Sequence, residues 1–246
     1  MGELLNHKNW PISGAGLDFI KIMAAILMLI DHIDHIVLDR EAVGMFFIGR
    51  GAYPLFAFAC AASFIRGGLD KAPKYAKNLI LWGLIVVPVS WMTRDTTAAN
   101  ILFTLAIGAG LLPFLIKIGV AGRAVIFTSA VLSLYFTNIV EFGFLGALAP
   151  AGFYLVMTGQ KDGTFWLVIT LALMNFGGFM HEVEGFGAIE ILIMFFVAAA
   201  TIGFSWLVLK LAEGMKRNEK RLLSKYFLHI FYPAHMIGLA LIKPFV

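Results

Sequence analysis

Apolar stretches of about 20 residues follow one another along almost the whole chain, and they restrict the possible folds more than any other feature. Nine such windows can be placed, at residues 16–37, 43–65, 76–93, 100–118, 122–140, 142–158, 164–180, 188–210 and 226–245. A helix rises about 1.5 Å per residue, so each window is about long enough to cross the ~30 Å hydrocarbon core of a bilayer. The sequence therefore predicts an all-α, polytopic integral membrane bundle of about nine transmembrane helices.

The composition also favours a lipid environment. Of the 246 residues, 60% are hydrophobic and 14% are charged, whereas soluble domains average about 25% charged residues. A water-soluble core of this length cannot hide so much apolar surface, so we expect a single membrane-embedded domain over residues 1–246. The single cysteine, Cys60, excludes an internal disulfide or a site built from several thiolates.

Basic residues are concentrated in alternate segments between the apolar windows. One side of the predicted membrane carries Arg66, Lys71, Lys74, Lys77, Lys117, Arg123, Lys161, Lys216, Arg217, Lys220, Arg221 and Lys225. The opposite side carries only Arg40 and Arg94 between the windows and Lys243 at the end of the last window. Because Lys- and Arg-rich loops stay in the cytoplasm, the sequence predicts a cytoplasmic N-terminus and a periplasmic C-terminus. The formal charge of +4 then reflects topology rather than nucleic-acid binding.

The first window contains a stripe of ionisable residues. Asp18, Lys21 and His32 fall within about 60° of one another on a helix, and Asp18 and His32 are about 21 Å apart along its axis. The three side chains can therefore line one path through the bundle. Alternatively, Asp18 and Lys21 form an ion pair across one helical turn, and His32 only anchors the outer interface.

The run Asp31-His32-Ile33-Asp34-His35 contains residue types that bind zinc. His32 and His35 share a helix face, but no third ligand follows at metal-site spacing, so we expect no metal. A histidine that is oriented by a neighbouring carboxylate suits general-base chemistry better, because its pKa lies close to neutral pH.

Arg50 lies among apolar residues in the second window, between Gly49 and Gly51. An arginine inside a membrane is costly unless it is paired or faces a polar cavity, so Arg50 is a candidate site residue. The alternative is a structural ion pair with Asp31 or Asp34. The small neighbours favour close approach of a helix or a ligand.

Other polar residues recur in or near the windows: Asn100, Asn138, Glu141, Asn175, His181, Glu182, Glu184, Glu190, His229, Tyr232 and His235. We expect His181, Glu182 and Glu184 to be solvated in a glycine-rich loop. His235, beside Pro233, lies deeper in its window than His229 and is the better site candidate, although a structural histidine in the bundle core is the alternative.

Five short blocks together resemble the TraX family. In chain order they are Asp31-His32-Ile33, Gly49-Arg50-Gly51-Ala52-Tyr53-Pro54-Leu55-Phe56, Asn100-Ile101-Leu102-Phe103, Glu141-Phe142-Gly143 and Phe231-Tyr232-Pro233-Ala234-His235. They cover nearly the whole chain, and each is weak alone. The resemblance implies an inner-membrane protein of a conjugative, type IV secretion system that acetylates the N-terminus of pilin subunits, with acetyl-CoA as the donor.

The same resemblance implies roles for individual residues. His32 would be the base or acyl-handling group, Asp31 would orient it, and Arg50 would stabilise the thioester oxyanion or a donor phosphate. Separately from the resemblance, we expect Lys21, near the inner end of the first window, and Asp18 to bind the donor, together with Asn100, Tyr232 and His235. The implied partners are a pilin subunit and membrane lipid.

Two other classes of function remain open from the residues themselves. A proton-coupled transporter also needs buried carboxylates and histidines, although the sequence contains no inverted repeat. A non-catalytic pilin chaperone or scaffold would explain the apolar windows but not so many ionisable groups within them.

Overall fold

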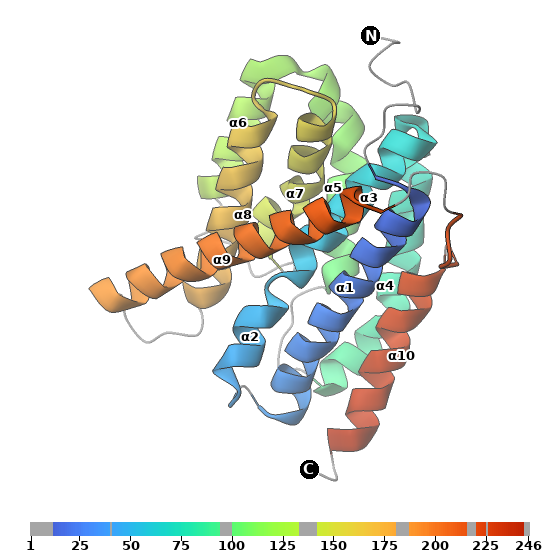
Figure 1. Cartoon of the computed structure of the whole chain (residues 1–246), viewed down its shortest axis with the longest axis vertical. Helices are drawn as coiled ribbons and strands as arrows, with labels where there is room; N and C mark the ends of the chain where they lie inside the picture. Colours follow the sequence, from blue (N-terminus) through green and yellow to red (C-terminus); the bar gives the residue numbers. More distant parts are fainter. Residues whose placement is uncertain are drawn as a thin grey trace. The chain divides into compact units, whose positions relative to one another are not determined.

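The computed structural model describes residues 12–39, 41–93, 100–132, 142–180, 187–215, 220–224 and 226–243. Throughout these residues all regular secondary structure is helical, which confirms the all-α class for this part of the chain. The helices are α1 Gly14–His32, α2 Val43–Gly49, α3 Ala52–Gly67, α4 Ala72–Thr93, α5 Ile101–Lys117, α6 Gly119–Leu132, α7 Gly143–Met157, α8 Gly163–Met180, α9 Ala188–Glu213 and α10 Phe227–Ile242 (Figure 1). The π-helix Ile33–Val37 extends α1, and the 3-10 turn Leu69–Lys71 precedes α4.

The helices follow the predicted apolar windows closely, with one division that the pattern did not indicate. The second window contains both α2 and α3, which are separated by a turn at Arg50 and Gly51. The N–H of Gly51 bonds the carbonyl of Ile48, three residues back, so the regular four-residue ladder is broken there. Pro54 lies in the first turn of α3, where its missing N–H costs no helical hydrogen bond.

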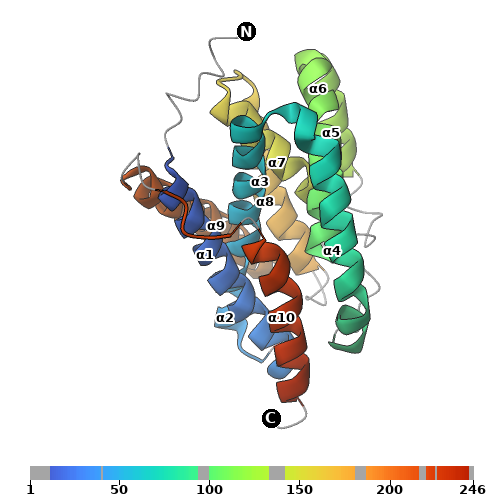
Figure 2. The ribbon, with the colours of Figure 1, turned by 90° about the vertical axis from the view of Figure 1, so that its right-hand side faces the viewer.

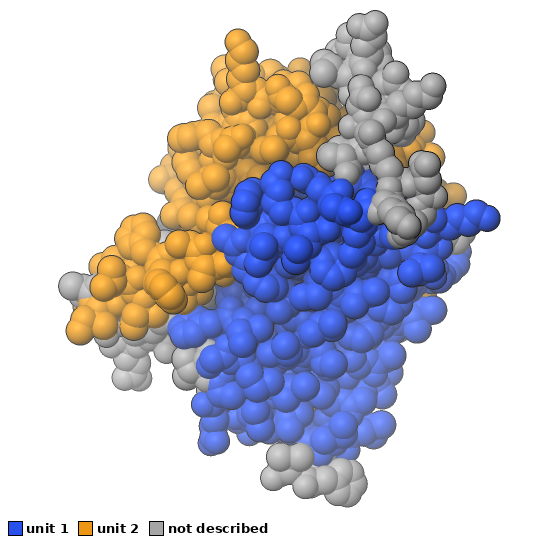
Figure 3. Space-filling view, in the orientation of Figure 1, with its two compact units in different colours: residues 1–59, 84–96, 203–246 blue, residues 60–83, 97–202 orange. Residues whose placement is uncertain are grey.

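The described residues group into two compact units, which Figure 3 colours separately. The first unit comprises residues 1–59, 84–96 and 203–246, and the second comprises residues 60–83 and 97–202. The candidate site residues His32 and His235 both belong to the first unit. The prediction of a single domain stays a prediction.

In the first unit, α1 packs against α2 and α10, and the π-helix that follows α1 also contacts α10 (Figures 1 and 2). Ser13 caps α1 by accepting a hydrogen bond from the Gly16 N–H at 2.9 Å. Near this end α1 approaches the end of α9 so closely that a β-carbon on Gly16 would lie 2.6 Å from the carbonyl oxygen of Ala212. Leu17 and Ile20 are buried on the same helix.

In the second unit, α7 packs between α5 and α8 and is apolar on nearly all sides. Leu145, Leu148 and Leu155 are almost completely buried. On α6 and α8, the rings of Phe127 and Trp166 stack with centroids 4.7 Å apart. Burial of this apolar surface is the main stabilising contribution within the unit.

Two described segments are long and apolar enough to cross a membrane: Gly44–Gly67, which includes α2 and α3, and Ile191–Glu213 in α9. Five other apolar helices of the described chain have 10–17 residues. The helix α1 is long but carries Asp18, Lys21 and Asp31. These two segments are consistent with a membrane protein, but they do not confirm about nine spans.

Candidate functional site: a histidine pair on α1 and α10

His32 lies at the point where α1 changes its winding. It is the last residue of α1, it is only 3% exposed, and the π-helix Ile33–Val37 begins directly after it. Such π-helical insertions are rare and frequently mark functional sites. The apolar pattern predicted a continuous helix here and did not indicate the change.

The structure brings His32 and His235 into direct contact, although 203 residues separate them in the sequence. The Nδ1 atom of His32 lies 2.6 Å from the Nε2 atom of His235, and the two rings stack with centroids 4.9 Å apart. The other nitrogen of His235, Nδ1, lies 2.8 Å from the carbonyl oxygen of Phe231 on the preceding turn of α10. The packing of α10 against α1 creates this contact.

The hydrogen bonds assign a tautomer to each neutral ring. A carbonyl oxygen can only accept, so Nδ1 of His235 carries the proton that is donated to Phe231. The Nε2 of His235 is then an acceptor, and Nδ1 of His32 must donate to it. Consequently the unprotonated nitrogen of neutral His32 is Nε2, which is the atom that can accept a proton in general-base chemistry.

Aromatic rings surround the pair. Tyr232 is only 2% exposed, and its ring meets His32 and His235 edge-on with centroid distances of 6.0 and 5.5 Å. On the other side, Phe231 stacks on His235 at 4.8 Å. An apolar, aromatic environment excludes water and strengthens the polar contacts inside it. Tyr232 and His235, both predicted to be site residues, therefore lie beside His32.

Asp31 lies at the contact between α1 and α2, and Arg50 follows α2 in the chain. A β-carbon on Gly49 would collide with the β-carbon of Asp31, so only glycine permits this approach. Arg50 ends α2, and its guanidinium lies 5.4 Å from the centre of the Phe46 ring. The structure thus brings Asp31 next to the residue that precedes Arg50 in the chain.

Asp34 holds the start of α2 in place. It is fully buried, and its Oδ1 accepts a hydrogen bond of 2.9 Å from the backbone N–H of Ala42. This bond closes the connection between the π-helix and α2. The sequence indicated Asp34 as a candidate ion-pair partner of Arg50 and did not predict this hydrogen bond to the backbone of Ala42.

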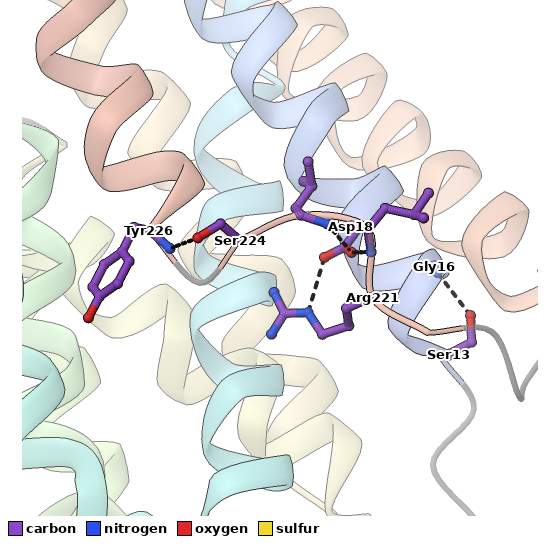
Figure 4. Close-up of polar contacts among 8 residues, drawn as sticks. Ser13, Gly16, Asp18, Arg221, Ser224 and Tyr226 are labelled. Carbon is purple, nitrogen blue, oxygen red and sulfur yellow. Dashed lines mark hydrogen bonds and ion pairs between the residues drawn. The ribbon is translucent and has the colours of Figure 1, made fainter.

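The other end of α1 carries a second buried carboxylate, that of Asp18. Its Oδ2 accepts the backbone N–H groups of Leu222 and Leu223 at 2.7 and 2.9 Å, and its Oδ1 accepts the Nε–H of Arg221 at 3.2 Å (Figure 4). Lys21 lies one turn farther along α1 and is half-buried. Sequence reasoning used Arg221 only for topology, and no spacing or motif connects it with a residue 203 positions earlier.

Asn100 has a clear structural function in the second unit. Its side chain caps α5 by accepting the Leu102 N–H at 3.1 Å, and it donates to the carbonyl of Gly83 on α4 at 3.0 Å. The oxygen and the nitrogen of the buried Asn100 amide are therefore both hydrogen-bonded to backbone groups. Its predicted part in donor binding stays a prediction.

Arg123 and Asp162 form an ion pair that the sequence did not indicate. The Nε and Nη2 of Arg123 donate to the two carboxylate oxygens at 2.7 and 2.8 Å. The distribution of basic residues predicts that Arg123 is a loop charge, but Arg123 lies on α6 with its side chain only 3% exposed. Its hydrogen bonds hold the pKa of Asp162 below the usual range of an aspartate.

Several candidates lie outside the described residues: Asn138, Glu141, His181, Glu182 and Glu184. Asn175 and Glu190 lie in α8 and α9, but their side chains are not described. Among the residues that are described, no group of three or more His, Cys, Asp or Glu side chains is placed to hold a metal ion.

Comparison with known proteins finds matches to one family. The family model for "TraX protein" matches residues 16–243. Two proteins named "Protein TraX", from Escherichia coli and from Escherichia coli strain K12, are 33% and 36% identical to the chain over 96 and 98 residues. Each alignment covers 39% of this chain and 38% of the relative, so less than half of either is matched. No solved structure matches the chain. Because the family model extends from α1 to the end of α10, the chain belongs to the TraX family.

Proposed function

We propose that this chain is an acyltransferase embedded in the bacterial inner membrane that moves an acetyl group from acetyl-CoA to an amine. The proposed acceptor is the N-terminal amine of a conjugative pilin subunit, as the family resemblance implies. The observation that carries the proposal is the part-buried His32–His235 pair, because its hydrogen bonds leave Nε2 of neutral His32 as the basic nitrogen.

The proposed reaction forms one C–N bond and breaks one C–S bond. Nε2 of His32 removes a proton from the acceptor ammonium, and the resulting amine attacks the thioester carbonyl. The nitrogen of the tetrahedral intermediate releases its second proton to water, and the intermediate expels the thiolate of coenzyme A, which takes the first proton back from the imidazolium. A base with a pKa near neutrality can perform both transfers.

His235 would act on His32 as a positioning residue. It accepts the proton of His32 Nδ1 in the ground state, and the same hydrogen bond becomes charge-assisted when His32 is protonated on both nitrogens. The carbonyl of Phe231 in turn fixes the His235 ring. In this scheme a histidine orients the base through a direct bond, and Asp31 adds negative charge from the adjacent position on α1.

Arg50 is the proposed source of positive charge for the developing oxyanion. A guanidinium can donate two parallel hydrogen bonds to an oxyanion or a phosphate. The close contact between α1 and α2 brings Asp31 next to Gly49, the residue that precedes Arg50 in the chain, which supports this proposal.

A membrane location is supported by the apolar side chains that remain exposed. On α9 alone, Ile189, Leu192, Phe196 and Trp206 are 60–73% exposed. Exposed apolar patches of this kind face lipid or a partner protein. We therefore retain the multi-pass topology with a cytoplasmic N-terminus and a periplasmic C-terminus.

Reporter fusions would test this orientation. Fusions after Lys74 and after Arg221 should report cytoplasm, and a fusion at the C-terminus should report periplasm. A periplasmic signal from the Lys74 fusion would reverse the proposed orientation.

Two rival functions can be separated from acyl transfer by one measurement. A proton-coupled transporter or a non-catalytic pilin chaperone would leave the pilin chemically unchanged. Mass spectrometry of the cognate pilin, from cells with and without this gene, should show an acetyl-sized difference at the N-terminus. An identical pilin mass in the two strains would exclude the pilin as the acceptor.

Purified variants would test the chemistry directly, with release of free coenzyme A as the readout. His32→Ala should abolish transfer and leave coenzyme A binding largely intact, whereas Lys21→Ala should chiefly weaken donor binding. His229→Gln is a matched control, because it changes another partly buried histidine of α10 to which the proposal gives no role. Wild-type transfer by His32→Ala would refute the assignment of the base.

A further inference from the structure

The short segment that leads into α10 is tied to the start of α1 by one carboxylate. Asp18 accepts three hydrogen bonds, two from the backbone of Leu222 and Leu223 and one from the side chain of Arg221. Figure 4 shows this segment crossing α1 at Asp18. The Asp18 side chain is 2% exposed and the Arg221 side chain is 37% exposed, so a buried carboxylate is paired with a guanidinium that reaches the surface.

The geometry leaves most of the guanidinium available for a ligand. A guanidinium has five N–H donors in a fixed plane, and Asp18 uses only the one on Nε. The Nη groups of Arg221 donate no hydrogen bond to any residue that the structure describes. The hydrogen bond from Nε to Asp18 therefore fixes the plane of the guanidinium and leaves its two Nη groups directed away from Asp18.

The charges around this point favour an anion. Lys21 follows Asp18 by one turn on α1, and the exposed Lys220 precedes Arg221 in the chain. Two lysines therefore lie close to Asp18 and Arg221 in the chain, and the carboxylate of Asp18 already accepts two backbone N–H groups. The planar guanidinium of Arg221 matches the oxygen atoms of a phosphate better than it matches a neutral group.

We propose that Arg221, oriented by Asp18, binds a phosphate group of the acyl donor, an inference that rests on the proposed acyltransferase function. Asp18 and His32 are separated by about 21 Å along α1. A ligand that occupies both ends must carry phosphates and a reactive acyl group at opposite ends of a long, flexible arm. Acetyl-CoA has this construction, with its thioester at the end of a pantetheine arm.

The phosphate of an anionic lipid offers the same chemistry at a membrane surface, so the test must separate the two sources. The protein is purified into nanodiscs of phosphatidylcholine only, and coenzyme A is titrated by calorimetry. Arg221→Gln and Asp18→Asn should each weaken coenzyme A binding by about 10-fold to 100-fold, the range expected when a charge-assisted hydrogen bond is lost or misdirected. Lys210→Gln, which removes an exposed cation paired with Glu213 on α9, is the control and should bind normally.

A double-variant cycle distinguishes positioning from general destabilisation. If Asp18 acts through Arg221, Asp18→Asn should have little further effect on coenzyme A affinity in the Arg221→Gln background. Additive losses would refute the positioning role of Asp18. Arg221→Lys, which keeps the charge but not the fork, should recover only part of the affinity.

Three outcomes would overturn the inference in distinguishable ways. Wild-type protein that binds no coenzyme A would reject the proposed function along with this site. Equal binding by wild type and Arg221→Gln would reject the site and leave the proposed function intact. An effect of Arg221→Gln on phosphatidylglycerol binding, with unchanged affinity for coenzyme A, would assign the residue to lipid.

Discussion

Replacing His235 with alanine removes the hydrogen-bond acceptor of His32 without touching the proposed base itself. The bond has a length of 2.6 Å and lies beside a ring that is 3% exposed, so water does not readily replace His235. Losing a partner at a buried donor that becomes charged costs about 1.5–3 kcal/mol. If this cost is felt in the transition state, kcat should fall about 10-fold to 150-fold.

His235→Gln is the informative companion variant, because a glutamine carbonyl can accept the same proton. We expect its kcat to lie between those of wild type and His235→Ala. Removal of the base in His32→Ala should cost more, about 100-fold to 10,000-fold. The double variant should be no slower than His32→Ala, because His235 acts only through His32.

The assay is release of coenzyme A from acetyl-CoA with an amine-terminated peptide acceptor, for variants whose melting temperatures confirm folding. Nitrogen-15 NMR of the His32 ring gives a second readout, since the tautomer with the proton on Nδ1 should dominate in wild type and lose its preference in His235→Ala. A kcat within twofold of wild type for His235→Ala, with an unchanged tautomer, would refute the reasoning.

Three further predictions follow from particular contacts. Asp162→Asn should lower the free energy of unfolding by about 1–3 kcal/mol at neutral pH. Because Arg123 lowers the pKa of Asp162, the stability advantage of the wild type should persist above about pH 4 and disappear as the pH falls further. Thermal melts of both proteins from pH 7 to 3 would check this. Gly49→Ala should destabilise the chain by about 1–3 kcal/mol because its β-carbon collides with the facing helix, whereas Gly44→Ala, with no atom within 4 Å of the new carbon, should be neutral or slightly stabilising in the same denaturation assay. Arg50→Lys should insert normally yet lose most acyl-transfer activity, because a flexible ammonium cannot replace a guanidinium fork; near-normal activity of Arg50→Ala would remove this residue from the site.

The candidate site was predictable in its residues but not in its contacts. His32, Arg50, Tyr232 and His235 stand out because polar groups within apolar helices need a reason to be there. The sequence did not indicate that His235 contacts His32 directly, since no local pattern relates residues on helices that are 203 positions apart. The π-helical winding after His32 was also missed, because apolar spacing predicts only that a segment is helical.

The sequence by itself determined the helical class, the placement of most helices and the family, because apolar period and short motifs are local properties of the chain. Tertiary structure decided which polar groups meet. Asp18 could have paired with Lys21 one turn away, yet its hydrogen bonds go to Arg221 and the two residues after it. Arg123, which looked like a loop charge, is buried against Asp162. A buried charge must find a partner wherever packing places one, and helix packing, rather than distance along the chain, decides which partners are within reach.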